Sequence, residues 1–542
     1  MRSCPSFQQA NSQGISREST TGDCMAWSRR IRLGVPDLVF GLVLVTILIR
    51  SQGLLNDPGT FWHARLGREI ASTGAVPRVD TLTYTRDHVA WVDQSWGFDL
   101  LLAAVVDRWG WSAAVAATAL GLATFYATVI RGLVREGASP MIAVVVIIPV
   151  FLIGTIHFLV RPHLLTFAFA WWTMRACRAQ HDRGGWAIAI VPLLMVGWAN
   201  VHGGFLAGPF IVLTAAFGHA FSGPWDKARQ RNLEKYAAVL VLSLLTPLAN
   251  PYGIGLYRHV ANLLFTSGVT TLIVEFQPIQ FGSGQARVVE WVLMALIALP
   301  CFTTRRMDRY NLVQTLVWLH LALASVRYAP IFALAMAPGL VQLLDGLSAE
   351  LRSTWQDRMT WSVWPVAMAL AVVLMAGFGA RFGDFDPTVW PIDAVASLNR
   401  QRLQTRLFHE QDWGGMIASE CRPPRRSFID DRFELFGKAE VLQYADALHG
   451  GPVWEAIRDR ERIELVWVRP TRGLARLLTG HPDWKILHRD AVSILFRREA
   501  GLKPECVSSA RLDRPEPSPV NRTVPPRSQP MTWATALEDS GF

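Results

Sequence analysis

The feature that most constrains this chain is a succession of long apolar stretches separated by short polar loops. Crossing a bilayer takes roughly 20 mainly apolar residues in a helix, and about eleven stretches come close to that length. Hydrophobic residues make up 51% of the 542 residues and charged residues 18%, which is too apolar for one soluble core. The sequence therefore predicts a polytopic α-helical membrane protein, with spans near residues 36–54, 111–131, 140–158, 163–177, 186–201, 204–221, 236–251, 288–304, 310–326, 328–345 and 361–380.

The positions of lysine and arginine indicate how the chain is oriented. Short cytoplasmic loops retain these residues, and every second loop is basic, beginning with Arg29, Arg30 and Arg32 before the first span. We therefore expect a cytoplasmic N-terminus and an external loop between the first two spans. With an odd number of spans, the C-terminal segment is also external. The net charge of +10 follows from this bias and an arginine-bearing tail, so no nucleic-acid partner is indicated.

Composition divides the chain into four parts. We expect a cytoplasmic lead over residues 1–34, a transmembrane domain over 35–380 with a first outer loop over 55–110, a small extracytoplasmic α/β domain over 384–500, and a disordered tail over 501–542. The lead has no cleavage pattern, so the first span is predicted to be an uncleaved anchor. Met1 and Met25 are alternative starts. In the α/β part, β-prone runs cover 406–409, 427–430, 463–468 and 492–496, and helical patterns cover 439–448 and 472–478.

The first outer loop concentrates polar side chains beside the membrane. Residues 60–71 and 98–109 are predicted to form two helices lying in the interface plane. Between and within them lie Asp57, His63, Asp80, Asp93 and Trp96, among further tryptophan, proline and arginine residues. We expect two interfacial helices flanking an acidic turn, which would make a rigid shelf at the membrane surface.

The layout of this loop resembles a known family. Asn56-Asp57-Pro58 is followed by an amphipathic helix that ends at residues 68–74, then by Val76-Pro77-Arg78, a turn with Trp91, and Trp109-Gly110. This order is similar to the first outer loop of GT-C superfamily glycosyltransferases, closest to the aminoarabinose and protein mannosyl transferase branches. The resemblance implies a GT-C-like fold, a polyprenyl-phosphate-linked sugar as donor, and Asp57 as the catalytic carboxylate.

A second resemblance lies in the C-terminal part. Residues 411–415, with Arg425 and residues 428–431, are similar to the acceptor-contacting motif of oligosaccharyltransferase catalytic subunits, and residues 271–275 resemble the acidic outer-loop motif of those proteins. The resemblance implies an outer-domain motif of Asp412, Trp413, Gly414 and Asp430. The chain has Asp57-Pro58 where superfamily members often carry two adjacent acidic residues. No metal site or other cofactor is therefore predicted, although a divalent cation stays an open alternative.

Transfer of a sugar needs a base for the acceptor hydroxyl and a cation for the departing phosphate. Asp57 is the candidate base, although an Asp before a helix is equally a normal N-terminal cap. His63, Asp80, Asp93 and Trp96 are the candidate acceptor loop, although Asp80 is alternatively a turn residue paired with a local arginine. Candidate phosphate-binding residues at the outer ends of spans are Arg161, His163, His202 and Arg327; arginines at such positions also serve as interface anchors.

We therefore expect an inverting hexosyl or pentosyl transferase in the inner (plasma) membrane of a bacterial cell envelope. Its partners are a polyprenyl-phosphate-sugar donor and a lipid, glycan or protein acceptor. One alternative is a transporter or flippase of a lipid-linked substrate, against which the absence of internal repeats argues. Another is a noncatalytic membrane assembly protein.

Overall fold

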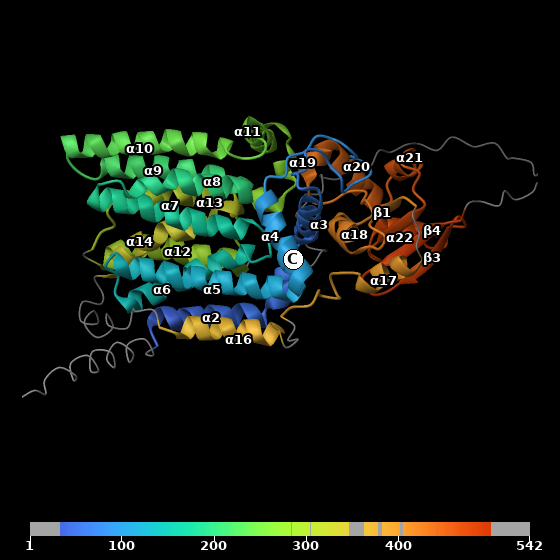
Figure 1. Ribbon diagram of the computed structural model, residues 1–542, viewed down its shortest axis with the longest axis horizontal. Coiled ribbons are helices and arrows are strands. Elements are labelled where there is room, and N and C mark those ends of the chain that lie inside the picture. The colour runs from blue at the N-terminus through green and yellow to red at the C-terminus, as the bar shows by residue number, and fades with distance from the viewer. Residues whose placement is uncertain are drawn as a thin grey trace, which may run out of the picture.

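The computed structural model describes residues 33–282, 284–303, 305–345, 362–377, 382–401 and 405–499. Figure 1 shows a bundle of roughly parallel helices at one end of the molecule and a smaller part that contains a sheet at the other end, with α3 and α4 at the junction. The predicted cytoplasmic lead, apart from its last residues, and the predicted disordered tail lie outside the described residues.

The bundle is built from long helices of mainly apolar residues. Several begin at side-chain caps, because Ser139, Asp226 and Asp308 each accept a hydrogen bond from a backbone N–H of the first turn. The helices are α2 (Val35–Ile49), α5 (Trp111–Arg135), α6 (Pro140–Gly154), α7 (His163–Arg183), α8 (Val191–Val201), α9 (Ala207–Phe221), α10 (Lys227–Leu245), α12 (Gly284–Phe302), α13 (Arg309–Ala324), α14 (Ala329–Leu344) and α16 (Trp364–Gly377).

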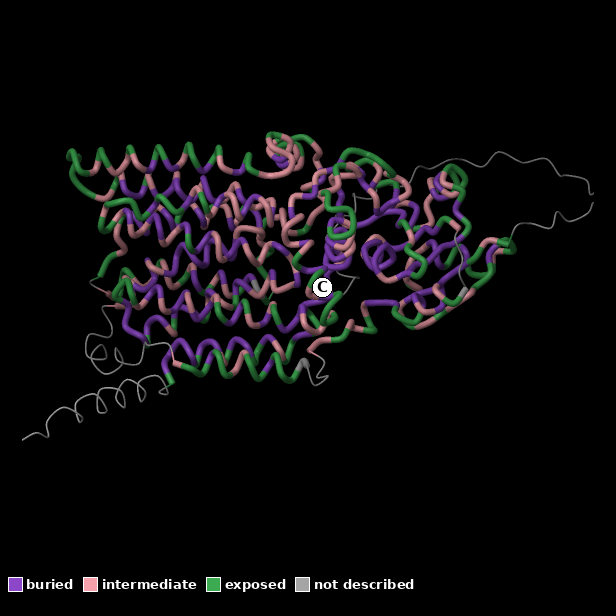
Figure 2. The backbone as a smooth tube through the Cα atoms, in the orientation of Figure 1, coloured by how far each residue is buried: buried purple, intermediate pink, exposed green. Residues whose placement is uncertain are grey.

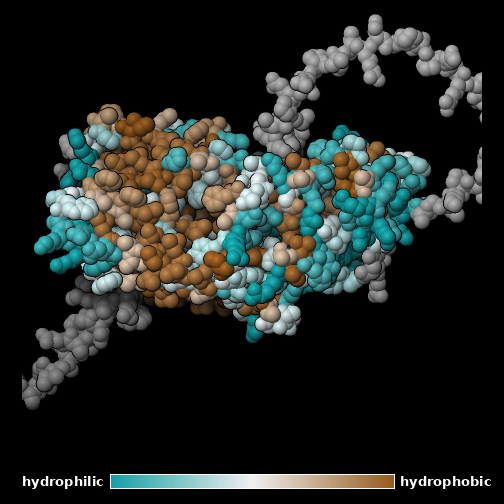
Figure 3. Space-filling view, turned by 90° about the horizontal axis from the view of Figure 1, so that it is seen from above, coloured by the Kyte–Doolittle hydropathy of each residue, from teal (hydrophilic) through white to brown (hydrophobic). Residues whose placement is uncertain are grey.

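On the face seen in Figure 3, the surface of the bundle is mainly apolar, whereas that of the sheet-containing part is mainly hydrophilic. The exposed fraction is 69 to 79% for four large apolar side chains, Leu42, Ile49, Trp291 and Ile297. Such exposure is unfavourable in water and favourable in contact with lipid. Buried residues line the inner faces of the helices (Figure 2). The chain is therefore a multi-pass membrane protein.

The helices that are both long and apolar enough to span a membrane are fewer than the spans that the sequence predicts. Four in the described part are long and apolar enough: Trp111–Arg135, Pro140–His157, Gly203–Phe221 and Val326–Leu344. Shorter apolar helices are Val35–Ile49, Ala187–Val201 and Trp364–Met375. One reason is that some apolar stretches are interrupted, and another is that long helices such as α7 and α10 carry several charged residues. The predicted span 36–54, for example, consists of α2 and a separate 3-10 helix, η1 (Ser51–Leu55).

Two helices of the first outer loop connect the bundle to the sheet. They are α3 (Pro58–Thr73) and α4 (Trp96–Trp109), each beginning two residues earlier than the sequence predicts. In α3 the reason is the cap, because Asp57 accepts from the Thr60 N–H and Pro58 occupies the first turn. The two helices pack closely at Gly67, where a Cβ atom would lie 1.9 Å from the Asp99 carbonyl oxygen.

The C-terminal part contains a four-stranded mixed sheet of order β1-β2-β4-β3. Strands β1 (Leu407–His409) and β2 (Leu465–Val468) are parallel, and β4 (Ile494–Arg498) pairs antiparallel with β2 and with β3 (Trp484–Arg489). Residues 427–430 do not form a strand and contribute one bridge, from Ser427 to Thr83. Strand β3 was not predicted, because it is an edge strand whose residues after Trp484 are largely solvated.

Alternate residues of the strands face two helical layers. Leu465 and Trp467 pack toward α17 (Ile392–Gln401) and α18 (Gly414–Glu420). Val466 and Val468 pack toward the opposite layer. This layer consists of α20 (Lys438–Leu448), α21 (Val453–Arg460) and α22 (Gly473–Leu478), preceded by the short α19 (Phe433–Phe436).

The sheet-containing part is packed firmly against α3. Phe61 of α3 is fully buried in the same cluster as Trp390 and Trp413. At Gly415 a Cβ atom would lie 2.6 Å from the carbonyl oxygen of Pro58, so only glycine permits this approach of α18 to α3. The first turn of α3, which carries Asp57, is therefore fixed between the bundle and the sheet-containing part.

Candidate functional site

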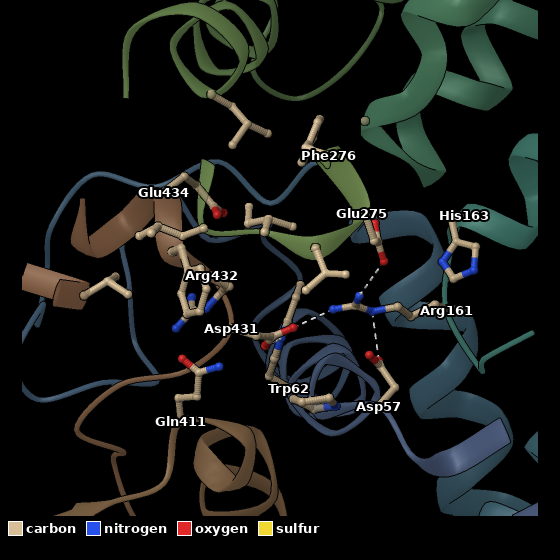
Figure 4. Close-up of a pocket in the computed structure, with 18 of the residues that line it drawn as sticks. Asp57, Trp62, Arg161, His163, Glu275, Phe276, Gln411, Asp431, Arg432 and Glu434 are labelled. Atoms are coloured by element: carbon tan, nitrogen blue, oxygen red, sulfur yellow. Dashed lines mark hydrogen bonds and ion pairs between the residues drawn. The ribbon is translucent and has the colours of Figure 1, made fainter. Parts of the chain in front are cut away.

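A cavity of about 510 Å³ lies at the junction between the bundle, the first outer loop and the sheet-containing part. It brings together candidate residues that are distant in the sequence. Asp57 and His63 come from α3, Arg161 from the turn before α7, and Arg327 from the 3-10 turn η9 (Val326–Tyr328) between α13 and α14. Figure 4 shows Arg161 in the middle of this site, pointing at three carboxylates.

The carboxylate of Asp57 is buried and uses its two oxygens differently. Oδ2 accepts from the Thr60 N–H at 2.9 Å and the Thr60 hydroxyl at 3.0 Å, and pairs with Arg161 Nε at 2.8 Å. Within the described residues, Oδ1 accepts no hydrogen bond. Asp57 therefore serves as the helix cap through one oxygen while the other remains available to a ligand in the cavity.

Arg161 holds the site together by contacting carboxylates from three separate segments. Besides Asp57, its Nη2 lies 2.5 Å from Asp431 Oδ2, and its Nη1 lies 3.6 Å from Glu275 Oε1. Asp431 belongs to the sheet-containing part and also accepts from the Trp62 indole at 2.7 Å. Glu275 lies in the 3-10 turn η8 (Val274–Phe276).

Three carboxylates around one guanidinium leave an excess of negative charge. Burial raises the pKa of Asp57, and Arg161 and the Thr60 hydrogen bonds offset this only in part. Burial likewise raises the pKa of Asp431 to about 7, with the nearby Asp57 adding to the effect and Arg161 opposing it. A proton is therefore readily held in this cluster near neutral pH.

Two hydrogen-bond donors face each other beside this cluster. His202 Nδ1 accepts from the Thr166 hydroxyl at 2.7 Å and the Gly204 N–H at 3.1 Å, so its proton is on Nε2. That Nε2 lies 3.5 Å from Arg327 Nη2, which is also a donor. Two converging donors with no acceptor between them form a site suited to an anion.

Arg327 is also held in place by a carboxylate. Arg327 Nη1 lies 3.3 Å from Glu275 Oε2, so Glu275 bridges Arg161 and Arg327. Burial alone would raise the pKa of Glu275, but Arg327, His157 and Arg161 outweigh it and hold that pKa well below its usual range. Glu275 is therefore ionised and orients both arginines.

The walls of the cavity differ in character. One wall is apolar and comes from the chain between α10 and α12: Val260, Leu263, Leu264, Leu272, Ile273, Val274 and Phe276. The polar wall comes from the sheet-containing part and is formed by Glu410, Gln411, Asp412, Tyr444, Arg469 and Arg472, while Phe433, Val441 and Leu448 of the same part also line the cavity. An amphiphilic ligand with an apolar chain and a polar head matches this division.

Not every predicted site residue reaches the cavity. Asp80 and Asp430 are buried beside it and both bind Arg432, at 2.8 and 2.6 Å. Trp96 donates its indole N–H to Asn200 at 2.9 Å. Asp93 is fully buried behind the cavity wall.

The remaining predicted residues are placed as follows. His163 lines the cavity, but its Nε2 lies 2.5 Å from the His157 carbonyl, which uses its donor. Of the outer-domain motif, Asp412 lines the cavity and binds Arg469 at 3.0 Å. Trp413 is buried under the sheet and Gly414 packs against the backbone of Ile429.

Four residues on which the site depends are not among those that the sequence predicts. Asp431 and Glu275 have a signal, since they close the stretches 428–431 and 271–275 that resemble oligosaccharyltransferase motifs. Asp99 and Arg432 had none, because a single charged residue in an amphipathic helix or a turn is usually solvated. Among the described residues, no group of three or more His, Cys, Asp or Glu side chains is arranged to hold a metal ion.

No protein-family profile and no curated protein matches the chain. Several solved structures are similar to it, among them the following three. ArnT from Cupriavidus metallidurans in the apo state has 14% identity and a TM-score of 0.47, over 88% of this chain and 98% of that one. The oligosaccharyltransferase of Archaeoglobus fulgidus, in a complex with zinc and sulfate, has 13% identity and a TM-score of 0.44, over 79% and 68%.

The arabinofuranosyltransferase AftD from Mycobacteria has 14% identity and a TM-score of 0.47, over 85% of this chain and 41% of that one. All three are GT-C glycosyltransferases, the superfamily that the first outer loop resembles. At such identities and TM-scores, similarity of shape does not assign a function. The function proposed next therefore rests on the cavity.

Proposed function

We propose that this protein transfers a sugar from a polyprenyl-phosphate carrier to an acceptor outside the cytoplasm, with inversion at the anomeric carbon. The observation that carries the proposal is the cavity itself. It places a carboxylate with a free oxygen, on Asp57, in one space with the converging donors of Arg327 and His202 and with an apolar wall.

The lining of the cavity favours one orientation of the donor. Its prenyl chain would lie along the apolar wall, and its phosphate would take the position between Arg327 Nη2 and His202 Nε2. Arg161 contacts Asp57 and Glu275, so its positive charge also lies near the position of the phosphate. The sugar then faces Asp57 and the polar wall, from which the acceptor enters.

The reaction follows from these positions. The acceptor hydroxyl oxygen forms a bond to the anomeric carbon while the bond from that carbon to the phosphate oxygen breaks. Asp57 Oδ1 takes the hydroxyl proton, and the electron pair leaves with the phosphate, whose added charge is stabilised by Arg327 and His202. Attack from the face opposite the phosphate inverts the anomeric centre.

The test measures release of the carrier, which does not require the sugar to be known in advance. The purified full chain in lipid nanodiscs is supplied with polyprenyl-phosphate-linked mannose, arabinofuranose or aminoarabinose and a membrane extract as the source of acceptor. We expect acceptor-dependent release of polyprenyl phosphate from at least one donor. Donors that merely redistribute across the bilayer, intact, would indicate a flippase instead.

Replacing Arg327 should weaken binding of the carrier. We expect Arg327→Gln to raise the Kd for polyprenyl phosphate about tenfold or more, because a hydrogen bond to a charged group contributes roughly 1.5 to 3 kcal/mol. Intrinsic fluorescence or microscale thermophoresis in nanodiscs would measure it. The matched control is Arg305→Gln, which should bind the carrier as the wild type does. Arg305 is exposed and lies just before the N-terminal end of α13, whereas Arg327 follows the C-terminal end. Equal Kd values for both variants would remove Arg327 from the phosphate site.

The proposal also requires the cavity to lie on the extracytoplasmic side of a bacterial inner membrane. In a cysteine-free background, Val89→Cys in the first outer loop and Ala456→Cys in α21 should react with a membrane-impermeant maleimide in intact cells; both positions are exposed. Lys227→Cys at the start of α10 should react only after permeabilisation. Labelling of one outer position without the other would contradict the placement of the sheet-containing part outside.

A further inference from the structure

A histidine and two carboxyl groups that the proposed reaction does not use form a buried chain behind the cavity wall. His63 lines the cavity, and its Nδ1 lies 2.6 Å from Asp99 Oδ1. Asp99, in the first turn of α4, is fully buried, as is Asp93. Asp99 Oδ2 and Asp93 Oδ2 both lack a donor among the described residues, although the two carboxyl groups adjoin each other. Such orphaned buried oxygens require an explanation.

One shared proton satisfies both oxygens. Asp93 Oδ1 accepts from the Ser95 N–H at 3.1 Å and is 3.4 Å from the Ser95 hydroxyl, which favours the ionised form of Asp93. Burial raises the pKa of Asp99 well above its usual range, and the charge of Asp93 adds to this. Burial raises the pKa of Asp93 to about 6 only, with the Ser95 hydrogen bonds opposing it. The proton therefore resides on Asp99 Oδ2 and is donated to Asp93.

This arrangement fixes the tautomer of His63. The unprotonated Oδ1 of Asp99 accepts the hydrogen bond from His63 Nδ1–H. Burial lowers the pKa of His63 well below its usual range, and Arg161 and His202 add to this, so the ring is neutral and Nε2 carries a lone pair. The ring is held against Trp62, 3.7 Å between centroids, and Phe98, 5.6 Å. Nε2 has no partner among the described residues.

We propose that His63 Nε2 accepts a hydrogen bond from a hydroxyl group of the sugar in the cavity, and that Asp99 is the residue that positions it. The inference rests on the proposed function and adds a specificity contact to it. A lone pair in a fixed direction repels an anionic phosphate and selects a group that carries a hydrogen.

The experiment compares kcat/KM for carrier release among variants of the two residues. His63→Phe keeps a ring on Trp62 but removes the lone pair, and we expect a loss on the order of 10- to 100-fold. Asp99→Leu should lose most of this activity as well, because only the distant Ser95 hydroxyl, 3.5 Å away, then remains beside His63 Nδ1. Asp99→Asn should recover most of that loss, since its amide reproduces a protonated carboxyl: the oxygen accepts from His63 and the NH₂ donates to Asp93. The matched control is Asp107→Asn, an exposed residue of the same helix α4 that pairs with Arg68.

Two outcomes overturn the inference while leaving the proposed function standing. One is a His63→Phe variant as active as the wild type in an assay that Asp57→Asn abolishes. The other is an Asp99→Asn variant no better than Asp99→Leu. If the wild type itself releases no carrier, the proposed function fails and this contact with it.

A second measurement does not depend on activity or on the leucine variant folding. With ring-¹⁵N-labelled histidine, the NMR signals of His63, assigned by their loss in His63→Phe, should show a protonated Nδ1 and an unprotonated Nε2. A proton on Nε2 would overturn the inference.

Discussion

Asp57→Asn should abolish transfer, with a fall on the order of 10²- to 10⁴-fold in carrier release, while the protein still folds and binds the carrier. Asparagine is as good an N-cap as aspartate, so its side-chain oxygen can still accept from Thr60 and begin α3. What it removes is the charge and basicity of the oxygen that faces the cavity. Steady-state release assays, with carrier binding measured in parallel, separate these effects.

The matched control for this substitution is Asp226→Asn. Asp226 caps α10 by accepting from the Arg229 N–H at 2.8 Å and is exposed, so it shares the capping role of Asp57 without lining the cavity. Transfer should be unaffected in the control. Full activity of Asp57→Asn would exclude Asp57 as the base, whereas loss of folded protein in Asp57→Asn alone would point to a structural role.

Arg432→Leu should destabilise the contact between the sheet-containing part and the first outer loop by about 3 to 5 kcal/mol, because it leaves buried charges without a partner. Arg432 is 2% exposed and binds Asp80 and Asp430, both of which are buried. It also lies over Trp91, 4.6 Å from the ring centroid. Chemical denaturation in detergent and protease susceptibility of residues 79–93 would measure the loss.

The control is Arg426→Leu, which removes an arginine paired with Asp87 at the surface, where the two side chains are 46% and 36% exposed. Solvent screens such a pair, so we expect a change below about 1 kcal/mol. If the two variants are equally stable, Arg432 does not hold the interface. A loss in Arg432→Leu that Asp80→Asn combined with Asp430→Asn reverses would support the charge argument directly.

The sequence predicted the parts of the site that depend on local signals. Asp57 before Pro58 indicated a helix start, and the structure has Asp57 as the cap of α3. The apolar stretches predicted the bundle helices, although 3-10 turns interrupt several of them. Arg161, His202 and Arg327 are cations at the predicted outer ends of spans, where a phosphate can be bound, and all three line the cavity.

The pairing of charged residues across the site has no local signal in the sequence. The arginine that pairs with Asp80 is the distant Arg432 and not a local one, and Asp431 rather than Asp430 reaches Arg161. Neither choice is visible in the sequence, because neighbouring aspartates have the same propensities and differ only in the direction of their side chains. The orientation of His63 likewise depends on Asp99, which belongs to another helix.

By itself, the sequence determined that the chain is a helical membrane protein with a polar loop near the ends of its apolar stretches, because burial of apolar residues and helix capping act over a few neighbouring residues. Only the tertiary structure decided which charges meet. Arg161 draws Asp57, Glu275 and Asp431 from three distant segments, and burial there makes their pairing strong. Electrostatic interactions depend on distance in space and on exclusion of water, and neither quantity is written in the order of the residues.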